Sequence, residues 1–279
     1  IISKVNTLIK ITDGSYADYE PTRAARAIAD FVVDDLSNWY VRLNRKRFWK
    51  PSENGKTAMS NDKLAAYQTL YECLVTVAKL MAPVAPFYSD QIFRDLNQVT
   101  QLESEISVHL VNFPEVNTSY IDENLEERMS LAQTISSLIH SLRKSHRLKV
   151  RQPLHKILLP VAGEKMQHQV QEVENLILTE VNVKEIEYLT DDNSILVKRI
   201  KPNFAKLGKL YGPKMKEINH LVQKMSQDEI NQLERENSFS LNISNEPIVL
   251  TREDVEISFQ DIPGWSVASE GNVTVALDI

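Results

Sequence analysis

The sequence has one cysteine, few glycines and no long apolar run. The lone Cys73 excludes an internal disulfide and a cysteine-rich zinc site, and it is typical of a protein from a reducing compartment. Only 7 of the 279 residues are glycine, while Leu, Ala, Glu and Lys are abundant, which favours a helical fold. No stretch approaches the roughly 18 apolar residues of a membrane span, and the first residues lack a signal-peptide cleavage site. We therefore expect a cytoplasmic protein with no membrane partner.

The sequence also lacks the motifs that usually carry chemistry. It has no glycine-rich phosphate-binding loop, and its six histidines show no metal-ligand spacing. We therefore predict no catalytic residue, no metal site and no cofactor within this chain. Because residue 1 is Ile rather than Met and the last residues form a strand-like run, we also expect a piece of a longer protein.

The net charge is -6, but the basic residues are strongly clustered along the chain. Three windows contain no Asp or Glu: residues 42–50 hold five Lys or Arg, residues 143–156 hold six and residues 198–216 hold seven. Together they carry more than half of the 32 basic residues in less than a sixth of the chain. A protein that segregates charge in this way can hold a polyanion on one surface while its acidic remainder limits non-specific adhesion.

Hydrophobic spacing divides the chain into two parts. Apolar residues recur at helical intervals up to about residue 150, and the proline at Pro21 fits the first position of a long helix. Beyond it, short strand-like runs alternate with helical stretches. We predict a mainly α fold, with an antiparallel helical bundle over residues 1–150 and a smaller α+β domain over residues 151–279. We expect helices over residues 21–49, 123–147, 164–180, 214–225 and 227–237. Two further helices are expected, one capped by Asn61 or Asp62 and ended by Pro83, and one that begins at Pro86. The expected strands cover residues 157–161, 183–188, 239–243, 255–259 and 273–277.

The segment from Leu36 to Trp49 combines basic and aromatic residues. Arg42, Arg45 or Lys46, and Trp49 are three to four residues apart, so they share a helix face distinct from the apolar stripe to which Trp39 belongs. Basic side chains neutralise phosphates and an exposed ring stacks on an unpaired base, which is the combination that single-stranded RNA loops require. A solvated helix face beside core aromatics would give the same spacing.

Four motifs of the chain resemble those of isoleucyl-tRNA synthetases. Ser37-Asn38-Trp39-Tyr40-Val41-Arg42, followed by Arg45-Lys46-Arg47-Phe48-Trp49, is similar to the signature of their anticodon-binding helical domain, although Leu43-Asn44 stands where many members carry a second arginine and a serine. Met81-Ala82-Pro83-Val84-Ala85-Pro86-Phe87 resembles a helix junction that the isoleucyl, valyl and leucyl enzymes share. Val150-Arg151-Gln152-Pro153-Leu154 and Lys201-Pro202-Asn203-Phe204 resemble later elements of the isoleucyl enzymes.

The resemblance implies a part of the parent enzyme that binds tRNA but performs no chemistry. The His-Ile-Gly-His signature of class I synthetases is absent, and Lys224-Met225-Ser226 lacks the second lysine of the Lys-Met-Ser-Lys-Ser loop, so we interpret it as a chance match. The part would position the anticodon stem-loop of isoleucine tRNA for aminoacylation by the catalytic domain of the same parent chain. ATP and Mg would be cofactors of that parent enzyme, DNA would not be a partner, and the oligomeric state stays open.

The three basic windows supply the candidate tRNA-binding residues. Two alternatives remain: the corresponding part of a valyl- or leucyl-tRNA synthetase, or a helical protein-interaction module that binds no RNA. The candidates are Arg42, Arg45, Lys46, Arg47, Trp49, Arg143, Lys144, Arg147, Lys149, Arg151, Lys201, Lys206 and Lys209.

Overall fold

A computed structural model describes residues 1–49, 60–161, 163–189, 198–243, 246–259 and 264–279. The chain forms two compact units, Ile1–Glu127 and Arg128–Ile279. The division lies inside one long helix, whereas the sequence predicts a domain boundary near residue 150. Past Glu127, that helix contacts the rest of the second unit through an ion pair of Arg128 with Glu172 and a hydrogen bond between His140 and Glu180, which explains why most of it belongs there. The domain boundary at residue 150 stays a prediction.

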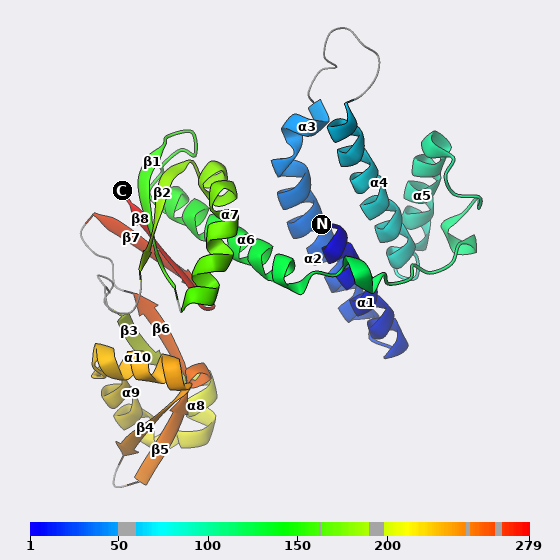
Figure 1. Cartoon of the computed structure of the whole chain (residues 1–279). Helices are drawn as coiled ribbons and strands as arrows, with labels where there is room; N and C mark the ends of the chain where they lie inside the picture. The colour runs from blue at the N-terminus through cyan, green and yellow to red at the C-terminus, as the bar shows by residue number, and fades with distance from the viewer. Residues whose placement is uncertain (50–59, 162, 190–197, 244–245, 260–263) are drawn as a thin grey trace. The chain divides into compact units, whose positions relative to one another are not determined.

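The first unit consists of helices packed side by side (Figure 1). Its core joins Val5, Leu8 and Ile9 to Phe31 and Leu80, all at most 5% exposed. Two short 3-10 turns, Val108–Leu110 and Thr118–Tyr120, follow the last helix of the unit. The helices are α1 (Ile2–Ala17), α2 (Pro21–Asp30), a π-helix (Phe31–Val41), α3 (Arg45–Trp49), α4 (Asn61–Met81) and α5 (Pro86–Thr100).

The apolar stripe predicted for the helix after Pro21 is confirmed. Ile28, Phe31, Leu36 and Trp39 are all at most 8% exposed. The helix continues through α2 and the π-helix, and a turn at Asn44 separates it from α3.

The predicted helix ends after residue 60 are partly right. The prolines act as predicted, because α4 ends at Met81 and α5 begins at Pro86, whose missing N–H is no loss at a first helical position. The predicted cap of α4 was wrong, because the Ser60 side chain, not that of Asn61 or Asp62, accepts the hydrogen bond from the Lys63 N–H.

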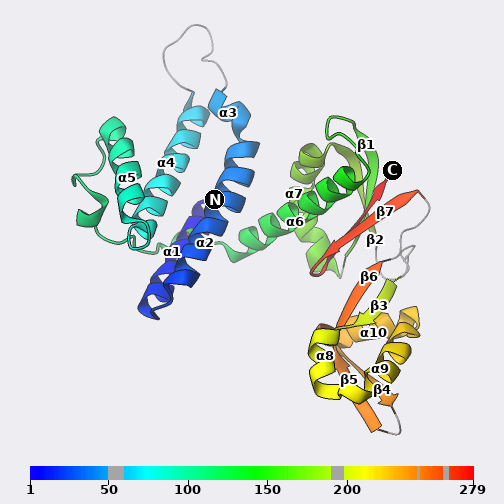
Figure 2. The same ribbon diagram turned by 180° about the vertical axis from the view of Figure 1, so that it is seen from behind.

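The second unit contains α6 (Glu123–Ser145, from Arg128 on) and a four-stranded sheet in the order β2-β1-β8-β7. β1 (Leu154–Pro160) and β2 (Val183–Leu189) are parallel and are connected through α7 (Glu164–Val181), whose buried face includes Val170 and Ile177. The antiparallel partner of β1 is β8 (Val273–Asp278), and that of β8 is β7 (Trp265–Glu270). Figure 2 shows α6 running beside α7.

Residues 198–259 of the second unit have a core of their own. It is built on Leu207, Ile218, Val222, Leu233 and Leu250, all at most 1% exposed. The elements are the paired strands β3 (Lys198–Pro202) and β6 (Val255–Phe259), the hairpin β4 (Ser238–Ile243) and β5 (Glu246–Thr251), and the helices α8 (Phe204–Tyr211), α9 (Met215–Gln223) and α10 (Gln227–Glu236), with 3-10 turns at Gly212–Lys214 and Arg252–Asp254.

The predicted fold class, a helical bundle followed by an α+β part, is confirmed. The sequence did not predict α1, α8 or the strands β3, β5 and β7. Among the helices that the structure describes, none is long and apolar enough to cross a membrane.

Candidate nucleic-acid interface

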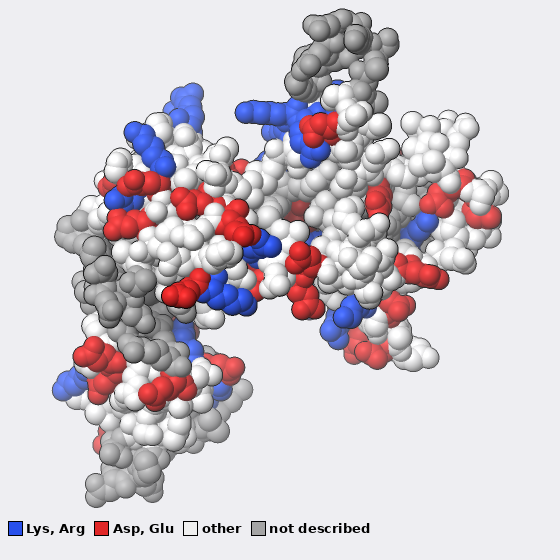
Figure 3. Space-filling view, in the orientation of Figure 1, with Lys and Arg blue, Asp and Glu red and all other residues white. Residues whose placement is uncertain are grey.

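Four predicted residues of the first unit form an exposed cluster at α3. We call Arg42, Arg45, Lys46 and Trp49 the first basic patch; all four side chains are exposed. The Arg45 guanidinium carbon lies 5.8 Å from the centroid of the Trp49 ring, within the range of a cation–π contact. Trp49 is 68% exposed, so much of the indole stays open to solvent. Figure 3 shows Lys and Arg side chains gathered at α3, with acidic side chains next to them.

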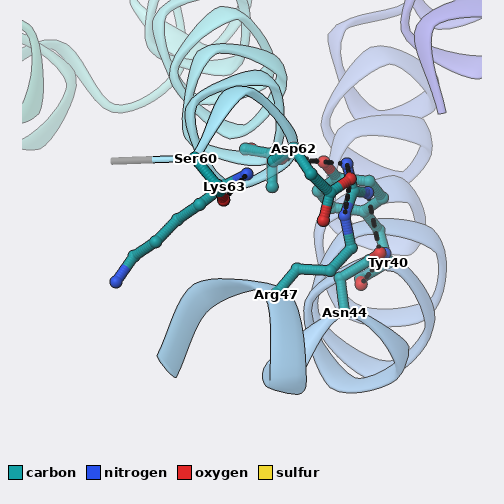
Figure 4. Close-up of polar contacts among 7 residues, drawn as sticks. Tyr40, Asn44, Arg47, Ser60, Asp62 and Lys63 are labelled. Atoms are coloured by element: carbon teal, nitrogen blue, oxygen red, sulfur yellow. Dashed lines mark hydrogen bonds and ion pairs between the residues drawn. The ribbon is translucent and has the colours of Figure 1, made fainter. Parts of the chain in front are cut away.

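The fifth predicted residue of this segment, Arg47, is held by a carboxylate. Its Nη2 lies 2.7 Å from Asp62 Oδ1, its Nε donates to the same oxygen over 2.9 Å, and its Nη1 donates to Asn44 Oδ1 over 2.9 Å. The hydrogen bond to Asp62 raises the pKa of the Arg47 guanidinium. Figure 4 shows this contact between α3 and the start of α4. We therefore assign Arg47 to positioning α3 and omit it from the proposed phosphate contacts.

An aromatic cluster fixes α3 from its inner side. Phe48 is 6% exposed and packs edge-on against Tyr40 and Tyr67, with ring centroids 6.3 and 5.2 Å away. Tyr67 Oη donates to the Phe48 carbonyl over 3.4 Å. Because Phe48 points inward and Arg47 is tied to α4, the remaining side chains of α3 point to solvent. The sequence did not predict the supporting roles of Tyr67 and Asp62.

A second cluster lies at the end of α6 in the second unit. Lys144, Arg147, Lys149 and Arg151 are exposed, and we call residues 144–151 the basic turn. The helix ends in a Schellman motif, in which the Leu148 N–H donates to the Arg143 carbonyl over 2.8 Å and the Arg147 N–H donates to the Lys144 carbonyl over 3.2 Å. This motif places Arg147 in the left-handed region, at φ 57°.

The left-handed conformation of Arg147 gives a stability prediction. An L-residue with a side chain is strained there and glycine is not, so Arg147→Gly is expected to raise unfolding stability by about 1 kcal/mol. For a domain of this size that is a rise in Tm of about 2 to 4 °C, measurable by circular dichroism. Arg147→Ala is the matched control, because it removes the same charge but keeps the strain. An equal gain from both substitutions would mean that charge repulsion, not the backbone, sets the effect.

Arg143, predicted to bind tRNA, is buried instead. Its side chain is 1% exposed, so it does not reach a phosphate. Its guanidinium donates to three backbone carbonyls, of Lys149, Gln152 and Asn182, over 3.1, 3.0 and 2.9 Å. Burial lowers the pKa of this guanidinium. We therefore remove Arg143 from the candidate RNA contacts; its position four residues after Ile139 puts it on the buried face of α6.

In the third basic window, one of the predicted residues is paired with carboxylates. Lys206 Nζ lies 3.0 Å from Asp254 Oδ1 and 3.1 Å from Glu253 Oε2, and these contacts raise the pKa of the ammonium group. Lys201 is exposed on β3, opposite Glu256 of β6 in the strand register. The side chain of Lys209 lies outside the described part of the structure.

The segment resembling the Lys-Met-Ser-Lys-Ser loop has a structural explanation. Ser226 caps α10: its side chain accepts from the Glu229 N–H over 3.3 Å, and the Glu229 carboxylate accepts from the Ser226 N–H over 2.7 Å. This reciprocal pair is a capping box. Met225 is 8% exposed and belongs to the core of residues 198–259. Within the described residues, no group of three or more His, Cys, Asp or Glu is placed to hold a metal ion.

Comparison with known proteins identifies the class. Residues 1–158, more than half of the chain, match the family described as the anticodon-binding domain of tRNA ligase, and the chain belongs to this family. The matched region contains both the first basic patch and the basic turn.

Over its whole length the chain is similar to proteins named isoleucine–tRNA ligase. It is 57% identical to the one from Cytophaga hutchinsonii over 280 residues, which are 25% of that protein. It is 50% identical to the one from Porphyromonas gingivalis and 37% identical to the one from Chlamydia abortus, and it covers 24% and 26% of them. The resemblance to isoleucyl-tRNA synthetases is thus confirmed, and the chain spans about a quarter of the length of these relatives.

Proposed function

We propose that this chain is the part of an isoleucine–tRNA ligase that grips tRNA and reads the anticodon stem-loop of isoleucine tRNA. The observation that carries the proposal is the first basic patch, in which exposed Arg45 lies over exposed Trp49 and two further exposed cations are close in sequence, inside the region that matches the anticodon-binding family. Its binding would position the tRNA for aminoacylation by a catalytic domain elsewhere in the parent chain. ATP and Mg would act in that domain, in the cytoplasm.

The two basic clusters have different parts in this proposal. In the first basic patch, Arg42, Arg45 and Lys46 neutralise phosphates of the anticodon loop while the Trp49 ring stacks on an unpaired base. The basic turn supplies phosphate contacts that add affinity without reading sequence, because phosphates carry no sequence information. We propose that the third basic window is a weaker contact, since Lys206 is already paired with two carboxylates.

The choice of isoleucine rests on the relatives. The proteins compared above are isoleucine–tRNA ligases, and the similarity extends over the part of the chain beyond residue 158 as well. A valyl or leucyl parent would explain the helical bundle equally well but not this similarity. A protein-interaction module would not require exposed cations beside an exposed indole.

Binding to three purified tRNAs tests the proposal. We expect this chain to bind isoleucine tRNA more tightly than valine tRNA or an isoleucine tRNA with a substituted anticodon, as measured by fluorescence anisotropy at several salt concentrations. Equal binding to all three tRNAs that is abolished by moderate salt would mean that the chain binds phosphates without recognising the anticodon. The proposed anticodon recognition would then be wrong.

A further inference from the structure

Among the described residues, Arg143 is the largest fully buried side chain, and it carries a charge. An arginine in a protein keeps its proton, so the charge itself is buried. In the part of the chain that the structure describes, no carboxylate pairs with it, and its partners are the three backbone carbonyls of Lys149, Gln152 and Asn182. Burying a charge costs free energy unless it is well compensated by hydrogen bonds. The three carbonyls are thus the groups that compensate the buried charge of Arg143.

The carbonyl groups belong to two segments that Arg143 ties together. Lys149 lies in the basic turn and Gln152 directly after it. Asn182 lies between α7 and β2. The Asn182 side-chain amide also donates to the Val150 carbonyl over 2.8 Å, and the Leu154 N–H donates to the Asn182 carbonyl over 3.1 Å. The carbonyls of residues 149, 150 and 152 are thus all engaged with Arg143 or Asn182, while the side chains of Lys149 and Arg151 are exposed.

The basic turn needs such a restraint for an electrostatic reason. Four exposed cations within eight residues repel one another, and an unrestrained turn would spread to separate them. Hydrogen bonds that fix the backbone hold the cations in one arrangement before RNA arrives, so that less conformational freedom is lost on binding. The buried guanidinium adds its own positive charge beneath the same surface, with no carboxylate to cancel it among the described residues.

We propose that Arg143 is a positioning residue for RNA binding. It does not touch RNA; it fixes the basic turn so that Lys149 and Arg151 meet phosphates together. This inference rests on the proposed RNA-binding function. It adds a residue that supports RNA binding without touching the RNA.

The test compares Arg143→Met with the wild-type chain in isoleucine tRNA binding across a salt series, below the melting temperature of every variant. Loss of about two phosphate contacts is expected to lower the affinity about tenfold and to reduce the slope of log K against log salt by about 1 to 2. The matched control is Ile177→Ala, which shortens a fully buried side chain of α7. An isoleucine side chain forms no hydrogen bonds, so this change removes none from the basic turn. It is expected to lower Tm but to leave the salt slope unchanged, and Arg143→Lys is expected to restore part of the slope.

A double-mutant cycle separates positioning from general destabilisation. Lys149→Ala is expected to weaken binding in the wild-type chain and to have little further effect in Arg143→Met, because the two changes act on the same contact. Should Arg143→Met fail to fold, Arg143→Lys decides. Lysine keeps the positive charge but lacks the planar guanidinium fork that reaches the three carbonyls, so it is expected to lose part of the salt slope.

Two results would overturn the inference while leaving the proposed function intact. One is a folded Arg143→Met that binds with the wild-type affinity and slope. The other, when Arg143→Met is unfolded, is an Arg143→Lys variant that binds with the wild-type affinity and slope. A wild-type chain that does not bind isoleucine tRNA at all would instead remove the proposed function, and with it this inference.

Discussion

Raising the salt concentration from 50 to 200 mM is expected to weaken isoleucine tRNA binding on the order of 1,000-fold. Each phosphate that a cation neutralises contributes roughly 0.7 to 0.9 to the slope of log K against log salt. If every exposed candidate of the two clusters makes one contact, the slope is about 5 to 6. These candidates are Arg42, Arg45, Lys46, Lys144, Arg147, Lys149 and Arg151.

The size of the slope also tells which clusters contact the tRNA. If the first basic patch acts alone, the slope falls to about 2 to 3 and the loss over the same salt range is only roughly 20- to 40-fold. Lys46→Ala and Lys149→Ala each test one cluster and are expected to lower the slope by about 1. Lys10→Ala, an exposed lysine of α1 outside both clusters, is the control and is expected to change nothing. A slope of about 3 or less in the wild-type chain would contradict phosphate contact by both clusters.

The helix beyond Pro21 has a long apolar stripe, whereas the stripe of α1 is short. The helix beyond Pro21 was predicted because Ile28, Phe31, Leu36 and Trp39 all face one core. In α1 the buried face also includes Ser3, Asn6, Thr12 and Ser15. Ser3, for example, contacts Glu126 and accepts from the Asp122 N–H over 2.9 Å, so tertiary hydrogen bonds stabilise the polar part of this face.

Two of the three strands that were missed, β3 and β7, have no clear strand pattern in the sequence. β3 reads Lys-Arg-Ile-Lys-Pro, and Ile200 is its buried apolar residue. β7 lies at the edge of the four-stranded sheet and reads Trp-Ser-Val-Ala-Ser-Glu, with no regular alternation. Both form because a partner strand, β6 or β8, supplies the hydrogen bonds, and pairing across distant sequence is not visible in a local pattern.

The candidate site was predicted in outline but not residue by residue. A window without Asp or Glu in sequence is not free of them in space, because carboxylates arrive from other elements. Asp62 reaches Arg47, and Glu253 and Asp254 reach Lys206. In the same way Lys156, the last residue of the second window, lies 2.9 Å from Glu185 and 2.8 Å from Glu187.

The burial of Arg143 could have been inferred from its helical spacing. It follows Ile135 and Ile139 on one face of α6, and both are fully buried. A basic residue near the end of a helix is also expected because it interacts favourably with the helix dipole. This second explanation concealed what the helical spacing of Arg143 indicated. The exposure of Trp49 and the burial of Trp39 were both predicted, because ten residues separate them and only Trp39 continues the stripe.

Replacing Trp49 by alanine is expected to weaken binding of isoleucine tRNA roughly 5- to 150-fold, because stacking of a base on an aromatic ring contributes about 1 to 3 kcal/mol. The indole is neutral, so the salt slope should not change. It is also 68% exposed, so Tm should stay within about 1 to 2 °C of the wild type. Anisotropy titrations at one salt concentration, with circular dichroism on the same samples, measure all three.

Three further variants decide whether stacking is the cause. Trp49→Phe keeps a ring and is expected to retain most of the affinity, whereas Phe87→Ala, which removes a 91% exposed aromatic at the start of α5, is expected to retain all of it. Arg45→Ala should lower both the affinity and the salt slope, because Arg45 carries a charge and also lies over the Trp49 ring. If Trp49→Ala binds the cognate and anticodon-substituted tRNAs as the wild type does, the indole reads no base. The first basic patch would then contribute charge alone, and anticodon discrimination would have to come from another part of the chain.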